Sequence, residues 1–183
     1  MKKNLTFLFL LTALYTFGQD GAWTAIKVDE NMEISLPGKV QRIDTTISKE
    51  GRTQTLHVLK SSTENSTLGV SITPVTSDKV ITNSPELLKK AINDVADGFC
   101  ASASKSNLSC TANDILVDNL QGKKTVVQDK DRKIEFTNYI FIIDKKLYLI
   151  SYNLKSTGTS ATALAEQDRL IHSVHFILSE PRN

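Results

Sequence analysis

Three histidines are the side chains of this sequence best suited to proton transfer or metal binding. His172 and His175 form an H-x-x-H pair, a spacing that on a helix places both imidazoles on one side, where two ligands can begin a zinc site. The H-E-x-x-H pattern of zinc hydrolases is not present, and Asp168 lies one helical turn before His172, where the two side chains can pair. His57 lies in a predicted strand. We expect solvated or paired histidines and predict no metal ligand among them.

A second candidate for chemistry is a group of carboxylates, Asp118, Asp129 and Asp131, which could hold a hard cation such as calcium. An EF-hand loop would need oxygen ligands at fixed steps, a central glycine and a closing glutamate, and this spacing is not present. Basic side chains interrupt the acids and would oppose a cation. These bases form a patch without interleaved aromatic residues, made of Lys123, Lys124, Lys130, Arg132 and Lys133. We expect a solvated hairpin that binds neither a cation nor nucleic acid.

Nucleophilic catalysis needs a nucleophile, a base and an orienting group, and no motif of this kind occurs. The sequence has no G-x-S-x-G elbow, no S-x-x-K set and no glycine-rich phosphate loop. The polar segment Ser156–Ser160 precedes a predicted helix, whose N-terminus could hold an anion, but an ordinary capped connection explains it better. We predict no catalytic residue and no cofactor site.

The N-terminal segment has the pattern of a secretory signal peptide. Lys2 and Lys3 precede an apolar run, Leu5–Phe17, that is shorter than the roughly 20 residues a transmembrane helix needs. The run ends with small residues at the positions a signal peptidase inspects, which predicts cleavage between Gly18 and Gln19. No cysteine follows the run, so the sequence carries no lipoprotein signal. We expect export to the periplasm or the exterior.

The composition is that of an ordinary globular domain. Of 183 residues, 40% are hydrophobic and 23% are charged, which excludes collagen, coiled-coil rods and wholesale disorder. Removal of residues 1–18 takes away two lysines and no acid, so the formal charge falls from +2 to zero and gives no preference for polyanions. We predict one α+β domain over residues 19–183, without a stable membrane anchor after cleavage.

The sequence has two cysteines, Cys100 and Cys110, which is an even number that can pair. The predicted leader would send the chain to an oxidising compartment, where disulfides form. The residues between them are mostly small and polar, so this segment can bend and bring the sulfurs together. Cys100 falls at the end of a predicted helix and Cys110 just before a predicted strand. We predict a structural disulfide. The alternatives are two buried free thiols, or a redox or metal role, for which the C-x-x-C spacing is not present.

Alternation of apolar and polar residues predicts four short strands, over residues 22–28, 32–36, 52–60 and 68–74. Leu56 and Val58 share one face of the third. Ser84-Pro85-Glu86 then starts a helix that should end near Cys100. The apolar residues of this helix recur at helical spacing and are Leu88, Ile92, Val95 and Phe99.

Two hairpins and a closing helix follow. The first hairpin is predicted over residues 115–128 around Gln121-Gly122, and the second over residues 134–154 with a turn at Asp144-Lys145-Lys146. Both faces of the second hairpin are apolar, so its strands need cover on both sides, and Phe141 and Ile150 should be buried. A helix over residues 160–173 supplies cover with Leu164, Leu170, Ile171 and Val174. The order ββββ-α-ββββ-α predicts an α+β fold, an antiparallel sheet sandwiched between helices.

Several of these features occur together in one known family. They are a tryptophan near the mature start, the run Met32–Lys39, the hairpin with two apolar faces, and a closing helix that ends at residues 171–176. In this combination the chain resembles the small exported bacterial proteins of the Mog1/PsbP-like superfamily, over most of residues 23–177. The resemblance implies an αβα sandwich, and the better-known members act by binding partners. None of their functional residues maps onto this sequence.

We therefore expect an exported, non-enzymatic binding or accessory module that binds an unknown protein or small-molecule ligand across one face of the sandwich. One alternative is a hydrolase-type enzyme assembled from scattered residues, such as His57 with an aspartate and a serine. The other is a metal or calcium binding protein that uses His172 and His175 or the region of Asp118 to Asp131.

The leader makes a direct prediction about the mature protein. Because small residues favour cleavage after Gly18, mass spectrometry of the exported product should give the mass of residues 19–183. A secreted product that retains residues 1–18 would contradict the cleaved leader.

Overall fold

The structure is a computed structural model that describes residues 22–49, 52–75, 84–129, 131, 134–155 and 161–178. The predicted leader and its cleavage site at Gly18 and Gln19 lie outside the described residues. The elements are β1 (Trp23–Lys27), β2 (Met32–Pro37), β3 (Gln41–Lys49), β4 (Arg52–Ser62), β5 (Ser66–Pro74), α2 (Pro85–Lys105), β6 (Ser109–Val117), β7 (Leu120–Asp129), β8 (Ile134–Ile143), β9 (Lys146–Leu154), α3 (Ala161–His172) and β10 (His175–Phe176).

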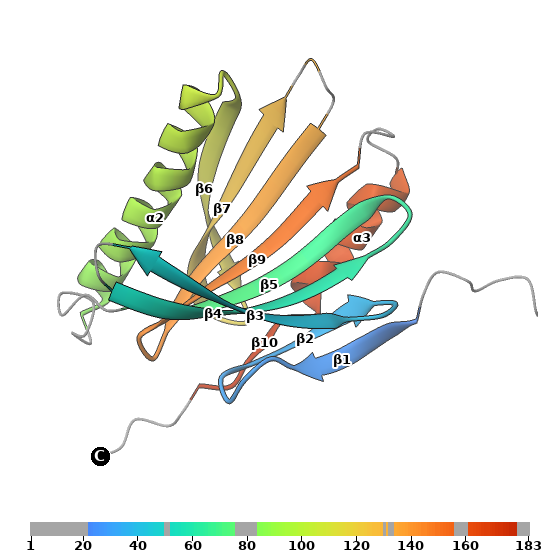
Figure 1. Ribbon diagram of the computed structural model, residues 1–183, viewed down its shortest axis with the longest axis horizontal. Helices are drawn as coiled ribbons and strands as arrows, with labels where there is room; N and C mark the ends of the chain where they lie inside the picture. The colour runs from blue at the N-terminus through green and yellow to red at the C-terminus, as the bar shows by residue number, and fades with distance from the viewer. Residues whose placement is uncertain are drawn as a thin grey trace, which may run out of the picture.

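Seven strands form one antiparallel sheet in the order β3-β4-β5-β9-β8-β7-β6, with the β8–β9 hairpin inside it (Figure 1). Along β8, Tyr139 and Phe141 point to one face, and Ile140 and Ile142 point to the other. All four are buried, and Phe141 and Ile150 are both 0% exposed, which confirms the prediction for this hairpin. Both of its faces therefore require cover.

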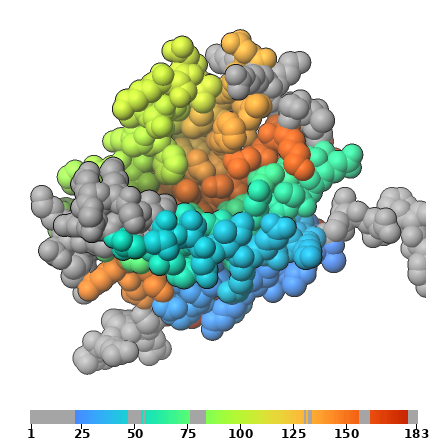
Figure 2. Space-filling view, viewed as in Figure 1, coloured from blue at the N-terminus to red at the C-terminus, as the bar shows by residue number. Residues whose placement is uncertain are grey.

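Different layers supply the cover on the two faces. On one face, Ile92 and Ala96 of α2 pack against Ile140 and Ile142. On the other face lie α3 and a second, three-stranded sheet in the order β1-β2-β10, which contributes Met32 to the larger core. The predicted sandwich between helices is thus correct for α2 and only partly correct for the second layer, which α3 shares with the small sheet. Figure 2 shows that α2 leaves part of β8 and β9 in view beside it.

The β6–β7 hairpin turns at Asp118 and Asn119, so the turn predicted at Gln121-Gly122 is wrong. Both turn residues have positive φ, 47° and 63°, as a two-residue hairpin turn of type I′ requires. Gly122 instead lies inside β7, where it pairs with Ile115 of β6 and faces the Phe141 ring of β8. A Cβ atom at Gly122 would come within 2.4 Å of the Phe141 ring, so glycine is needed here for close packing.

Two strands were not predicted. The edge strand β3 is polar and exposed along the part whose side chains are described, so it lacks the alternation that marks a half-buried strand. The other, β10, is two residues long and pairs with β2. In β4 the buried residues are Leu59 and Ser61, on the face opposite Leu56 and Val58, because this face is turned toward the larger core.

Helix α2 starts with Pro85 as predicted, but it continues past Cys100 to Lys105. Helix-forming alanines extend it, and the buried Ala103 adds apolar contact. The hydroxyl of Ser104 donates to the Cys100 carbonyl at 3.0 Å, which keeps this polar side chain compatible with the helix. The chain leaves the helix through Asn107, at a φ of 57°. Among the described helices, none is long and apolar enough to cross a membrane.

Helix α3 is held over the sheet by apolar and polar contacts. Leu170 and Ala163 are buried in the larger core, whereas Leu164 is 57% exposed, contrary to prediction. The Glu166 carboxylate accepts hydrogen bonds from Ser66 at 2.9 Å and from Thr63 at 3.1 Å, which joins α3 to the β4–β5 turn. At the other side, the guanidinium of Arg169 lies 4.7 Å from the centre of the Trp23 ring in β1.

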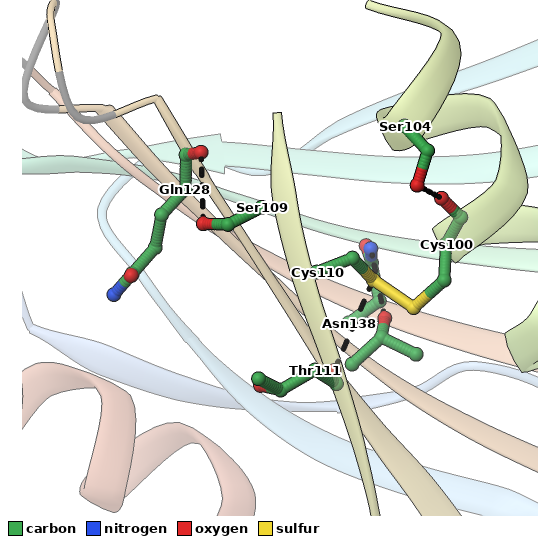
Figure 3. Close-up of a disulfide and its surroundings, with 8 residues drawn as sticks. Cys100, Ser104, Ser109, Cys110, Thr111, Gln128 and Asn138 are labelled. Carbon is green, nitrogen blue, oxygen red and sulfur yellow. Dashed lines mark hydrogen bonds between the residues drawn. A yellow bond between two sulfur atoms is a disulfide. The ribbon is translucent and has the colours of Figure 1, made fainter. Parts of the chain in front are cut away.

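Cys100 and Cys110 form a disulfide, with their Cα atoms 5.2 Å apart (Figure 3). Both cysteines lie inside regular elements: Cys100 is a full turn before the end of α2, and Cys110 is the second residue of β6. The bridge therefore joins helix to edge strand directly, in addition to closing the connection between them.

We expect the disulfide to stabilise the fold by about 2.5–3 kcal/mol, because it closes a loop of about ten residues in the unfolded chain. Urea unfolding of Cys100→Ser/Cys110→Ser should give a free energy of unfolding lower by this amount. Addition of a reductant to the natural chain should have the same effect. Thiol titration of the denatured, unreduced protein should find no reactive thiol, and two after reduction. Equal stability with and without reductant would contradict a structural role.

Candidate functional site

A groove of about 760 Å³ lies between α3 and strands β6, β7 and β8 and is here named the α3 groove. It forms because α3 lies beside, and not over, the β6–β7 end of the sheet. Ile115 and Val117 of β6 contribute apolar walls, and Ile171 of α3 and the buried Val174 face them. The exposed large apolar side chains at the rim are Leu116 (65% exposed) and Leu164 (57% exposed).

One buried polar group of the α3 groove is unsatisfied. Gln167 is only 7% exposed, and its Nε2 atom makes no hydrogen bond of ordinary geometry with a described residue, although the amide lies close enough to the Tyr139 hydroxyl to lower its pKa. A buried amide left in this state costs about 1–3 kcal/mol. Gln167 replaces an apolar residue in the buried stripe of α3, between Ala163 and Leu170. A polar residue at a core position of the helix was therefore the sequence signal for this site. It was missed because Leu164, and not Gln167, was assigned to the buried face of the helix.

Two further polar side chains, Tyr139 and Lys124, line the α3 groove. The Lys124 ammonium lies 5.7 Å from the centre of the Tyr139 ring, in cation–π contact. Burial raises the pKa of Tyr139 to about 12; the charges of Asp168 and Glu135 act in the same direction, and the neighbouring Gln167 acts against them. Tyr139 is therefore neutral at physiological pH and serves as a wall rather than a base.

Each of the three histidines pairs with one aspartate. Nδ1 of His172 lies 3.2 Å from Oδ1 of Asp168, as the sequence predicts. His172 ends α3, whereas His175 belongs to β10, so the expectation that H-x-x-H places both imidazoles on one helix is wrong. His175 lies 2.8 Å from the carboxylate of Asp118.

The Asp118 carboxylate also accepts a hydrogen bond from the backbone N–H of Phe176, at 2.6 Å. It thereby ties the β6–β7 turn to the C-terminal strand and closes one end of the α3 groove. The carboxylates considered for calcium lie apart, since Asp118 precedes β7 and Asp129 ends it, with Asp131 just beyond. Among the described residues, no three His, Cys, Asp or Glu side chains are grouped to hold a metal ion.

The basic patch divides in the structure. Lys123 pairs with Asp114 at 2.7 Å, and Lys124 lies over Tyr139. The remaining members, Lys130, Arg132 and Lys133, lie outside the described residues. Ser156–Ser160, considered as an anion site, lie outside them too.

A second polar cluster lies where the β1–β2 turn meets the β8–β9 turn. Tyr148 donates to Asp29 at 2.7 Å, and Lys146 donates to the same carboxylate at 3.0 Å. The backbone N–H of Asn31 adds a third hydrogen bond at 2.9 Å, and Glu30 pairs with Lys146 as well. Tyr148 is fully buried. The cluster thus satisfies its own members and fastens the small sheet to the centre of the large one.

Electrostatics in this cluster favour its ionised state. Burial raises the pKa of Asp29, but hydrogen bonds from Tyr148, Asn31 and Lys146 outweigh burial and hold it below its ordinary value. Burial lowers the pKa of Lys146, and its contacts with Glu30 and Asp29 outweigh this and raise it. Burial and the hydrogen bond to Asp29 raise the pKa of Tyr148.

The same cluster borders a cavity of about 380 Å³ that includes the pair His57 and Asp44, 2.9 Å apart. A histidine–aspartate pair is two thirds of a hydrolytic triad. No serine, threonine or cysteine lines this cavity in the described part of the chain.

No protein-family model matches the chain, and no curated protein matches it in sequence. Its structure is similar to the solution structure of cyanobacterial PsbP (CyanoP) from Synechocystis sp. PCC 6803, with a TM-score of 0.53 over 90% of this chain and 99% of that chain. Sequence identity is 16%, so the likeness shows the fold. The chain has the PsbP-like fold, as the sequence resemblance implies, while the sandwich between helices is present only in part.

The Asp29 cluster predicts a defined pH dependence of stability. Because folding lowers the pKa of Asp29, this carboxylate stabilises the protein above its unfolded pKa of about 3.9, and this contribution is lost as the pH falls through the folded value. Asp29→Asn should therefore lower the free energy of unfolding by about 1–3 kcal/mol at neutral pH, and the difference should shrink in acid. Urea unfolding at a series of pH values measures it.

Lys146→Gln is the matched variant, and its effect on stability should depend on pH in the opposite direction. Because folding raises the pKa of Lys146, its contribution is present below the unfolded value of about 10.4 and is lost as the pH rises through the folded value. A stability difference that stays constant with pH for both variants would contradict the ionised cluster.

Proposed function

We propose that this chain is an exported, non-enzymatic binding module that takes its ligand in the α3 groove. The observation that carries the proposal is the buried Gln167 amide, whose Nε2 lacks a partner among the described residues and lines an apolar groove. Natural structures satisfy nearly all buried polar groups. An acceptor oxygen of a bound ligand would satisfy this one.

The groove walls indicate what kind of ligand fits. Ile115, Val117 and Ile171 favour an apolar body, while Gln167 and Lys124 favour a hydrogen-bond acceptor at one end. Binding sites of this kind are mostly apolar with a few placed polar groups. We therefore assign the groove to a ligand with apolar groups and an acceptor oxygen.

Two features support export to the periplasm or the exterior. The leader pattern with its predicted cleavage at Gly18 and Gln19 is one. The Cys100–Cys110 disulfide is the other, because such bridges persist mainly in oxidising compartments.

The non-enzymatic assignment rests on the way the reactive side chains are used. His57 faces Asp44 in a cavity whose described lining has no serine, threonine or cysteine, and the Asp29 carboxylate is committed to three donors. Replacement of His57 by alanine should leave the proposed binding intact, since His57 lines a separate cavity and not the α3 groove.

The apolar anion 8-anilinonaphthalene-1-sulfonate is a suitable probe of the α3 groove, because its rings match the walls and its sulfonate offers acceptors. We expect saturable binding, and a loss of affinity of about fivefold in Gln167→Leu, the equivalent of one hydrogen bond. The same variant should raise the free energy of unfolding by about 1 kcal/mol, because it removes an unsatisfied buried amide. Fluorescence titration and urea unfolding measure the two effects.

Two exposed leucines on helices provide matched controls. Leu164→Ser, at the groove rim, should weaken binding, whereas Leu87→Ser on α2, outside the groove, should not. Equal affinities for the natural chain, Gln167→Leu and Leu164→Ser would show that the probe does not use the groove, and the proposed site would be wrong.

A further inference from the structure

Strand β6 ends the seven-stranded sheet, and its outer edge has no strand partner among the described residues. In an antiparallel pair, opposed residues alternate between hydrogen-bonded and non-hydrogen-bonded pairs. Val117 and Leu120 flank the two-residue turn and form a hydrogen-bonded pair, as do Ile115 and Gly122 two steps on. The backbone groups of Leu116 and Asp114 therefore point outward, where they can pair with another chain.

A hollow lies on each side of this edge. The α3 groove lies on one face of β6, and a second cavity of about 360 Å³ lies on the other face, between α2 and strands β6 and β7. The two hollows share Ile115 and Leu116 in their walls, and Leu116 is the most exposed large hydrophobic side chain of the described surface. A strand added beside β6 would direct its side chains alternately into the two hollows.

Each hollow also contains a buried polar atom that lacks a partner within the described chain. In the α3 groove this is the donor Nε2 of Gln167, and in the second cavity it is the acceptor Oδ1 of Asn93. Successive side chains or backbone groups of an extended segment could satisfy both. A compact ligand that fills the groove alone would reach Gln167 and leave Asn93 unsatisfied.

The charges around the edge are compensated in pairs. Asp114 lies 2.7 Å from Lys123 and 3.7 Å from Lys89. At the groove rim, Asp168 pairs with His172 and Asp118 with His175. Together Lys89, Lys123 and Lys124 balance the charges of Asp114, Asp118 and Asp168, so the walls complement an uncharged segment with apolar and hydroxyl side chains.

We propose that the α3 groove and the second cavity together bind an extended, uncharged polypeptide segment of a partner protein, which adds to the sheet as a strand beside β6. This inference rests on the proposed function and specifies its ligand. Backbone hydrogen bonds to the free edge supply affinity, and the two hollows select alternate side chains, as in other cases of strand addition.

A set of fluorescein-labelled nonapeptides that alternate Leu or Val with Ser or Thr provides the probe. We expect at least one to bind the purified protein saturably by fluorescence anisotropy. In the complex, the amides of Asp114 and Leu116 should become protected from hydrogen exchange, because their N–H groups acquire carbonyl partners. Side chains that merely fill the groove would not protect these amides.

Leu116→Pro removes one outward N–H and should lower peptide affinity about fivefold or more, the effect of one lost hydrogen bond. By the same alternation Thr46→Pro changes an outward position of β3, the opposite edge of the sheet, and should bind the peptide like the natural chain. Thermal unfolding confirms that each variant is folded, and hydrogen exchange on the unaltered protein tests the proposal without any variant.

Three results would overturn strand addition. They are peptide binding without protection of the Asp114 and Leu116 amides, unchanged affinity in folded Leu116→Pro, and binding of the anilinonaphthalene probe with no binding of any peptide. The last result would leave the α3 groove as a binding site. Failure of both probes would overturn the proposed function as well.

Discussion

The fold depends on burying both faces of the β8–β9 hairpin at once. Phe141 and Ile150 face one side and Ile140 faces the other, and each is completely buried. Burial of a large apolar side chain contributes about 1.5–3 kcal/mol, so an uncovered face would forfeit much of the stability of a domain this size. Two covering layers are therefore required. Helix α2 forms one of them, and α3 together with the small sheet forms the other.

Close packing around this hairpin determines the rest of the larger core. The Phe141 ring occupies the space in which Gly122 would carry a side chain, which brings β7 against β8. Tyr148 crosses the same face and ends in the Asp29 cluster, which fastens the β1–β2 turn. Apolar packing and a satisfied polar cluster thus act together to place the small sheet.

The α3 groove exists because α3 and the small sheet share the layer that covers one face of the large sheet. Helix α3 has 12 residues, about 18 Å of length, whereas seven strands at about 4.8 Å spacing make a sheet roughly 29 Å wide. The small sheet reaches this end only at the β6–β7 turn, where His175 and Phe176 of β10 contact Asp118, and the groove stays open between that contact and α3. The uncovered end carries Ile115, Val117 and Leu116, apolar residues of an edge strand that packing within the described chain leaves partly exposed.

Much of the fold was predictable because its strongest signals are local. The two apolar faces of residues 134–154, Pro85 at a helix start and the pairing of Cys100 with Cys110 all follow from spacing and residue type. The second layer was not predictable in this way, because β10 consists of two residues and exists only where tertiary contact with β2 brings them. The turn at Asp118 was missed for a related reason: Gly122 serves packing against Phe141, whereas a glycine in sequence suggests a turn.

The candidate site was harder to predict, because its most informative residue is a polar side chain at a buried position, and burial is known only from the structure. The sequence draws attention to His172, His175 and His57, yet the structure satisfies each with an aspartate. Gln167 attracts no attention as a residue type, but at a core position of α3 it has an amide without a partner in the described structure. Natural sequences depart from local consistency mainly where function requires it. For this chain, the departure lies at Gln167, and the proposed binding site is therefore the groove and edge strand beside the reactive side chains.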